Sequence, residues 1–260
     1  MFLQPVQYLL GALSGCLVGF SLGLFGGGGS ILAVPLMVYL VGVPVPHVAI
    51  GTSAFAVAAS ALINLLSHMR KHIKWRCVLI FSGGGVGGAL VGSSLGKLVD
   101  GQHLLLLFAI LMLVVGVLMF RSRRDGGDPT VECNRQNAGK VIAFGGMAGA
   151  VSGFFGIGGG FLIVPSLVAA TGMPIINAIG SSLAAITIFG FTTAANYTIS
   201  GLVDFFLATI FIIGGGIGGV VGSLLAKRLS AYKGVLNILF SVLIFVVATY
   251  MIYRSINVIV

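Results

Sequence analysis

The chain has 260 residues, of which 58% are hydrophobic and only 7% are charged, with 14 basic and 5 acidic side chains. Soluble domains carry roughly 25% charged residues, so this composition excludes a soluble globular domain, and it also excludes a disordered chain, which needs low hydrophobicity and high charge. The 41 glycines follow no triplet period and accompany only 7 prolines, so the chain is not collagen-like.

Long runs without charge predict a polytopic helical membrane protein. Asp, Glu, Lys and Arg are absent from residues 1–69 and again from 141–203. A helix of about 20 apolar residues crosses a hydrocarbon core of about 30 Å, and the alternation of a barrel strand is missing. The start lacks the positive region and cleavage site of a signal peptide, so we expect the first apolar segment to remain in the protein.

In chain order, the apolar segments form two sets of five on either side of one long polar stretch. The first set is 7–25, 30–43, 47–67, 77–96 and 103–120, and the second is 141–155, 160–172, 176–199, 205–226 and 234–253. We therefore expect a first transmembrane repeat at 1–120, a linker at 121–140 and a second transmembrane repeat at 141–260.

Four blocks of the first half recur in the second half, in the same order and at nearly the same spacing. The longest pair is Gly23-Leu-Phe-Gly-Gly-Gly-Gly-Ser-Ile-Leu-Ala-Val-Pro35 and Gly153-Phe-Phe-Gly-Ile-Gly-Gly-Gly-Phe-Leu-Ile-Val-Pro165. The other pairs are 42–44 with 172–174, 50–53 with 179–182, and 83–88 with 214–219. Two copies of one unit are typical of many secondary transporters.

The basic residues predict that the second copy is inverted relative to the first. Twelve of the 14 lie in the loops after the third, fifth and ninth segments, and the other side keeps only Lys97 and Arg254. Basic loops face the cytoplasm, which places the linker 121–140 there and both termini outside. Inverted repeats also explain why the loop after segment three carries four basic residues and its counterpart near Asp204 none.

The sequence does not decide whether the second segment of each repeat spans the membrane or re-enters it. Residues 31–43 would extend only about 20 Å as a helix, which is too short to span, and they include Pro35. Five crossings per unit, and three crossings plus a re-entrant hairpin of the first two segments, fit the charges equally well. We expect an all-α polytopic fold with two inverted repeats of about five helical segments each and broken or re-entrant Gly-rich helices at the centre.

The polyglycine turns between the first and second segments are candidates for a ligand site. Exposed backbone cannot face lipid, so such a turn lies inside protein or lines a watery cavity. The helix that follows directs its free N–H groups at the occupant, which favours an anion. Close helix packing is the alternative, and we prefer it for 83–88 and 214–219. The turn residues are Gly26, Gly27, Gly28, Gly29 and Ser30, and Gly156, Gly158, Gly159 and Gly160.

Neutral polar side chains in the third segment of each repeat extend this candidate site. They are Thr52, Ser53 and Asn64 in the first repeat, and Ser181, Ser182 and Asn196 in the second. Neutral donors can bind an oxyanion without a buried positive charge, and an unpaired amide is costly in a membrane. For the hydroxyl residues, an interhelical hydrogen bond is an equally good interpretation.

Other kinds of chemistry find little support in the sequence. No Asp or Glu falls within an apolar segment, so the usual carboxylate of a proton relay or sodium site is missing. No spacing of His, Cys or carboxylates resembles a metal site, and we expect neither a metal nor a cofactor. Cys16, Cys77 and Cys133 show no paired spacing, so we interpret them as small buried side chains plus one free thiol in the linker.

At the repeated blocks the sequence resembles the sulfite exporter TauE/SafE family of bacterial and plant anion permeases. The residues that carry the resemblance are 23–35, 51–53, 153–165, 180–182 and 201–204. The resemblance covers nearly the whole chain and implies transport of sulfite, sulfonates or related sulfur-containing or organic anions across the inner membrane. One position breaks the symmetry, because the first unit has Lys74 where the second has Asp204.

These expectations combine into one functional hypothesis. The chain is a secondary transporter or facilitator, not an enzyme, that exports small anions such as sulfite, sulfonate or sulfoacetate-like compounds across the bacterial inner membrane. Its partners are the anion and the lipid bilayer, with no nucleic acid, and its oligomeric state, including a homo-oligomer, stays open. The alternatives are an intramembrane enzyme, for example a serine protease using Ser30 or Ser53 with a histidine, and a membrane biogenesis partner without transport activity.

Overall fold

The computed structural model describes residues 4–68, 73–121, 133, 135–158, 160–229, 242 and 244–254. Every regular element in these ranges is a helix, and six of the helices are long and apolar enough to cross a membrane. They are α1 (Pro5–Phe25), α3 (Pro46–His68), α4 (Trp75–Gly96), α6 (Arg135–Phe155), α8 (Ile175–Ile199) and α9 (Phe205–Leu229). The predicted all-α polytopic membrane fold is confirmed.

Among the described residues, each half has one further helix after its last long helix. α5 (Gly101–Arg121) follows α4, and a helix at Ile244–Arg254 lies beyond α9. α6 begins at Arg135 rather than near Val141, so it includes the end of the stretch 121–140 that we assigned to the linker. Most of that stretch, and the first part of the predicted segment 234–253, lie outside the described residues.

The second segment of each half is short, and in the first half it is broken. It consists there of a 3₁₀ helix, η1 (Gly26–Leu32), one α-helical turn, α2 (Ala33–Pro35), and one π-helical turn, η2 (Leu36–Leu40). Pro35 lies where the α-helical turn gives way to the π-helical turn and has no N–H group to donate to the helical ladder. The counterpart in the second half, α7 (Gly160–Thr171), has 12 residues with Pro165 inside it and is about 18 Å long.

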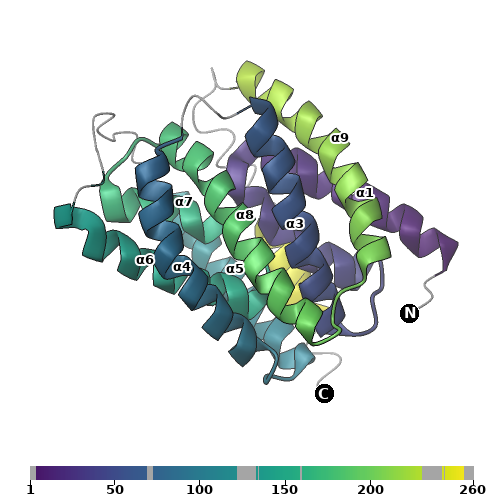
Figure 1. Cartoon of the computed structure of the whole chain (residues 1–260). Coiled ribbons are helices and arrows are strands. Elements are labelled where there is room, and N and C mark those ends of the chain that lie inside the picture. The colour runs from purple at the N-terminus through teal and green to yellow at the C-terminus, as the bar shows by residue number, and fades with distance from the viewer. Residues whose placement is uncertain are drawn as a thin grey trace.

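The long helices pair across the two halves rather than within them. α1 packs along α9, α4 packs along α6, and α3 and α8 lie side by side between these pairs (Figure 1). By the sequence repeat, α1 corresponds to α6 and α4 corresponds to α9. The two outer pairs are therefore built in the same way, with the halves exchanged.

Three glycines of α1, spaced four residues apart and therefore on one face of the helix, meet three backbone carbonyl groups of α9. In chain order the contacts are Gly15 with Phe211, Gly19 with Gly215, and Gly23 with Gly219. A Cβ atom at any of the three glycines would overlap the carbonyl that it faces. Both residue numbers rise together along the row, so α1 and α9 run parallel, as Figure 1 also shows.

The same row of contacts recurs between α6 and α4. The pairs are Gly145 with Phe81, Gly149 with Gly85, and Gly153 with Ala89. On α4, Gly84 and Gly88 in turn meet the carbonyl groups of Ile142 and Gly146. The prediction that the glycine-rich blocks within the long helices serve packing is thus confirmed, although Gly83 faces open space.

The two central helices, which correspond to each other by sequence, run antiparallel. A Cβ at Gly51, near the start of α3, would meet Tyr197, near the end of α8, whereas a Cβ at Gly190 would meet Ala58 further along α3. These two helices are also the most buried of the long ones. Equivalent helices in antiparallel orientation are what an inverted repeat requires.

The prediction for the cysteines is wrong for two of the three. Cys77, in the first turn of α4, and Cys133, just before α6, form a disulfide with their Cα atoms 5.3 Å apart. Cys16 is free. The sequence separation of 56 positions hid the pairing, which arises because α4 and α6 pack in parallel and their starts therefore lie at the same end.

Replacing Gly19 by alanine is expected to loosen α1 from α9, because the methyl group would overlap the carbonyl of Gly215. Overpacking of this kind costs about 1–3 kcal/mol, so the midpoint of thermal unfolding in detergent should fall. Gly87→Ala is the matched control, since Gly87 also lies within a long helix but has nothing within 4 Å of its Cβ position. Equal midpoints for the two variants would contradict the packing role of Gly19.

Candidate functional site

The two glycine turns meet inside the molecule. A Cβ at Gly27 would press against the backbone of Gly160, and one at Gly160 would collide with the carbonyl of Gly27. Gly27 belongs to the first turn of η1, all of which is buried, and Gly160 is the first residue of α7. The starts of two short helices, one from each half, therefore lie against each other.

Backbone conformation requires glycine in both turns. Gly26 and Gly156, which correspond by the sequence repeat, each have a φ of 65°, and so does Gly158. Glycine adopts this left-handed region without steric cost, whereas other residues do so rarely. The equal values show that the chain leaves α1 and α6 in the same way. The predicted site residue Gly159 lies outside the described residues.

Each turn is covered by the central helix of the opposite half. Gly26 lies against the side chain of Ile179 on α8, and Gly156 lies against Ile50 on α3. The sequence prediction included the hydroxyl residues that follow these isoleucines but not the isoleucines themselves. Their presence at the start of both repeated blocks, 50–53 and 179–182, was the signal that could have found them.

The hydroxyl groups of three predicted site residues donate to carbonyl groups three residues earlier in the chain. The pairs are Ser30 with Gly27 at 3.0 Å, Ser53 with Ile50 at 2.9 Å, and Ser182 with Ile179 at 2.8 Å. Ser53 Oγ also lies 3.4 Å from the carbonyl of Gly156, which links α3 to the turn of the other half. A serine nucleophile needs a base to take its proton, so these bonds to carbonyls do not favour a serine enzyme.

Thr52 and Ser181 join helices across the two halves. Thr52 Oγ1 accepts a hydrogen bond from the backbone N–H of Asp204 at 2.9 Å, and Ser181 Oγ accepts one from the N–H of Lys74 at 3.2 Å. Asp204 and Lys74 directly precede α9 and α4, where N–H groups lack partners within the helix. Both hydroxyls therefore make an interhelical hydrogen bond, which was the alternative to ligand binding in the sequence analysis.

Asn64 and Asn196 bond to other helices rather than to the turn residues. Asn64 donates to the carbonyl of Ser60 at 3.0 Å and faces Gly219 of α9, the residue that meets Gly23 near the end of α1. Asn196, near the end of α8, donates to Ser93 Oγ of α4 at 2.6 Å. The two amides thus lie where the central helices meet α9 and α4.

Lys97 is a candidate functional residue that the sequence prediction did not include. Its Nζ donates to the carbonyl and the Oδ1 of Asn196, at 3.2 and 2.9 Å, and to Ser200 Oγ at 2.9 Å. It also lies 5.8 Å from the centre of the Tyr197 ring. A cation is favourable at the C-terminal end of a helix, so Lys97 fastens the end of α4 to the end of α8. In the sequence, Lys97 stands apart from the basic loops, and this position could have identified it as a candidate.

Several buried hydroxyl groups among the described residues have no hydrogen-bond partner. They belong to Ser14, Ser60, Ser82, Ser152, Thr193 and Tyr197. Buried hydroxyls normally find a partner, so an unpaired one marks a place that water or a ligand can occupy. Thr193 and Tyr197 are one helical turn apart on the same face of α8, which extends the set of polar groups along this central helix.

Thr52→Val is expected to lower stability, because it removes the acceptor for the Asp204 N–H and leaves that group unpaired. An unpaired buried donor costs about 1–3 kcal/mol, which a thermal unfolding curve in detergent detects. Thr52→Ser keeps the acceptor and serves as the control. If Thr52 instead binds a ligand directly, Thr52→Val will reduce transport without moving the unfolding midpoint.

The chain is similar to known membrane transporter proteins along nearly its whole length. Residues 11–251 match the family described as Sulfite exporter TauE/SafE. The chain is 54% identical over 259 residues to a probable membrane transporter protein of Xylella fastidiosa (strain 9a5c), with 98% of each chain covered. It is 28% identical over 265 residues to the probable membrane transporter protein YunE of Bacillus subtilis (strain 168), with 93% of this chain and 94% of the relative covered. No solved structure matches it.

Proposed function

The chain belongs to the sulfite exporter TauE/SafE family, and we propose that it is a secondary transporter or facilitator for small sulfur-containing or organic anions. It is a multi-pass membrane transporter, as its six apolar helices and the names of its relatives indicate. Sulfite, sulfonates and sulfoacetate-like compounds are the proposed substrates. The proposed direction is export across the bacterial inner membrane, with the stretch 121–140 on the cytoplasmic side.

The contact between Gly27 and Gly160 is the observation that carries the proposal for an anion. The first residues of η1 and α7 lie together there, and N–H groups at the start of a helix have no partner within the helix. Their partial positive charge favours an anion. Backbone dipoles and serine hydroxyls, rather than a lysine or arginine, would then hold the substrate.

Binding of this kind suits transport. An ion must bind strongly enough to enter a site and weakly enough to leave it. Ile50 and Ile179, which cover the two turns, are apolar, so they add no opposite charge that would trap the anion. The apolar segments hold no Asp or Glu that could carry a coupling proton or sodium ion. The membrane potential drives an anion outward at about 2.3 kcal/mol per charge per 100 mV, so export needs no coupled ion.

We also propose that the two halves are inverted repeats, and that the α1–α9 pair and the α4–α6 pair, each built from both halves, move relative to each other during transport. The antiparallel orientation of α3 and α8 supports this relation, as does the recurrence of the α1–α9 glycine contacts between α6 and α4. In transporters of this type, one bundle rocks against the other around a fixed central site. The site between the two turns satisfies this requirement, because each half contributes one turn.

Purified protein in liposomes is expected to carry labelled sulfite or sulfonate down an imposed membrane potential. The initial rate should rise with the potential. For a sulfonate, which stays fully ionised near neutral pH, the rate should not respond to a pH gradient at zero potential, because no carboxylate in the apolar segments can relay a proton. Empty liposomes control for leakage. Flux that depends on the pH gradient alone would contradict uncoupled transport, and absence of flux for sulfite, sulfonate and carboxylate anions alike would contradict the anion proposal.

Gly28→Ala tests the position of the site. Gly28 is buried in η1, and its φ is not positive, so its backbone can accommodate alanine. The methyl group would narrow the space beside the turn and should lower the initial rate by about tenfold, equivalent to about 1.4 kcal/mol. Gly87→Ala, whose methyl group meets open space, should transport normally. Full transport by Gly28→Ala at an unchanged unfolding midpoint would place the site elsewhere.

A further inference from the structure

We propose that Cys77 and Cys133 form a reversible redox site that slows transport when it is oxidised, an inference that rests on the orientation and the transport activity proposed above. Their disulfide belongs neither to the glycine turns nor to the contacts between α3 and α8. It joins the first turn of α4 to the residue that lies just before α6.

The pair lies at the strongly basic end of the molecule. Lys74 and Arg76 precede Cys77, and Arg135 follows Cys133. These basic residues belong to the loops that the charge distribution places in the cytoplasm. Cytosolic thiols are kept reduced, and disulfides there are usually transient, catalytic or redox-sensing rather than structural. The geometry of the two cysteines therefore permits a disulfide, whereas the reducing cytosol opposes one. A site that combines these two conditions can form and break its disulfide reversibly.

The fold holds the two residues ready for bond formation. Their Cα atoms are 5.3 Å apart, and native disulfides have Cα separations of about 4.4–6.8 Å. The glycine contacts that begin with Gly145 and Phe81 pack α4 and α6 in parallel, which brings the two cysteines to the same end of this helix pair. Cys77 lies in the first turn of α4 and Cys133 just before α6, and both side chains are buried.

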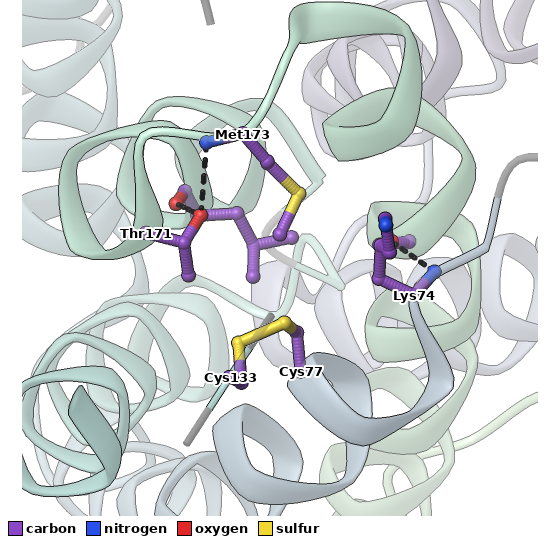
Figure 2. Close-up of a disulfide and its surroundings, with 7 residues drawn as sticks. Lys74, Cys77, Cys133, Thr171 and Met173 are labelled. Atoms are coloured by element: carbon purple, nitrogen blue, oxygen red, sulfur yellow. Dashed lines mark hydrogen bonds between the residues drawn. A yellow bond between two sulfur atoms is a disulfide. The ribbon is translucent and has the colours of Figure 1, made fainter. Parts of the chain in front are cut away.

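The surroundings connect the pair to elements of the candidate site. Figure 2 shows the disulfide with Thr171 and Met173, at the end of α7, on one side and Lys74 on the other. Thr171 Oγ1 accepts a hydrogen bond from the N–H of Met173 at 3.2 Å, which closes the turn that leads into α8. The N–H of Lys74 bonds to Ser181 of α8. The pair thus lies where α4 meets the end of α7 and is linked to the central helix.

A closed disulfide restricts movement at this point. It ties the start of α6 to the start of α4, and through the bond between Lys74 and Ser181 it restrains α8 as well. α6 leads directly into the turn at Gly156, so restraint of its start reaches the candidate site. The reduced protein lacks this tie. We therefore expect oxidation to slow the relative movement of the helices and with it transport.

The oxidation is balanced with a peroxide as the oxidant. One of the two thiols loses its proton, and its thiolate attacks a peroxide oxygen; the O–O bond breaks to give a sulfenic acid and a hydroxide ion, which takes up the released proton and becomes water. The other thiol then attacks the sulfenic sulfur, the S–S bond forms, and the sulfenic hydroxyl leaves with the thiol proton as a second water. In total, two thiols lose two electrons and two protons, and one peroxide becomes two waters. Exposures of 1% for Cys77 and 5% for Cys133 favour a small oxidant over a protein disulfide. A small dithiol reverses the bond by thiol–disulfide exchange.

The oxidation state in cells is measured first. Cells that express the full chain are quenched with acid, and free thiols are labelled with a polyethylene glycol maleimide under denaturing conditions, before and after hydrogen peroxide. With Cys16→Ser as background, the chain should carry two labels before peroxide, none after it, and two again after dithiothreitol. A chain without labels in untreated cells, or one whose labels peroxide does not change, would overturn the redox site.

Transport is then measured with the same variants in liposomes under a membrane potential. After peroxide treatment and removal of the excess peroxide, the flux of a labelled sulfonate, which reacts neither with peroxide nor with disulfides, should fall severalfold in the wild type and in Cys16→Ser, and dithiothreitol should restore it. Cys77→Ser and Cys133→Ser should keep their flux in peroxide, because neither can close the bond. Equal flux of the oxidised and reduced wild type would overturn the coupling to transport.

Two controls separate a failure of this inference from a failure of its premises. A membrane-impermeant maleimide that labels Cys133 from outside intact cells would contradict the proposed orientation and, with it, the cytoplasmic site. If the fully reduced wild type carries no sulfite, sulfonate or carboxylate, the proposed function fails and the coupling fails with it, whereas the labelling experiment still decides whether the thiol pair is reversible.

Discussion

Close backbone contact between rows of glycine and carbonyl groups is the constraint on which the rest of this structure depends. Lipid tails are as apolar as leucine, so helices in a bilayer associate through close packing rather than through the hydrophobic effect. α1 meets α9, and α4 meets α6, at distances that a Cβ atom would prevent. Each of these pairs joins one half of the chain to the other, so neither half completes its packing alone.

The two glycine turns come together because the helices that lead into them pack against helices of the opposite half. α1 leads into Gly26 and α6 leads into Gly156, so attachment of these helices to the opposite half determines where both turns lie. The opposite half then covers each turn with an isoleucine, and the hydroxyls of Thr52 and Ser181 hold the starts of α9 and α4. Each of these contacts joins one half of the chain to the other.

The polar side chains near the turns mainly hold backbone, which leaves backbone as the group available to a substrate. Ser30 and Ser53 donate to carbonyl groups, whereas Lys97 uses its donors on Asn196 and Ser200 at the C-terminal end of α8. Burying an unpaired cation in the membrane would cost free energy. A cation that already has a partner would favour that partner over the anion. Helix starts provide positive potential without that cost.

Hydropathy and charge are properties of individual segments, so the sequence by itself determined the membrane class, the helix positions and the two glycine turns. The doubled blocks also predicted which residues correspond, as the equal φ of Gly26 and Gly156 shows. Contacts between helices depend on which helices pair, and a row of glycines on one helix can pack against a helix of either half. Only the tertiary structure therefore decided that Asn64 and Asn196 face α9 and α4, that Ile50 and Ile179 cover the turns, and that parallel packing of α4 with α6 brings Cys77 to Cys133.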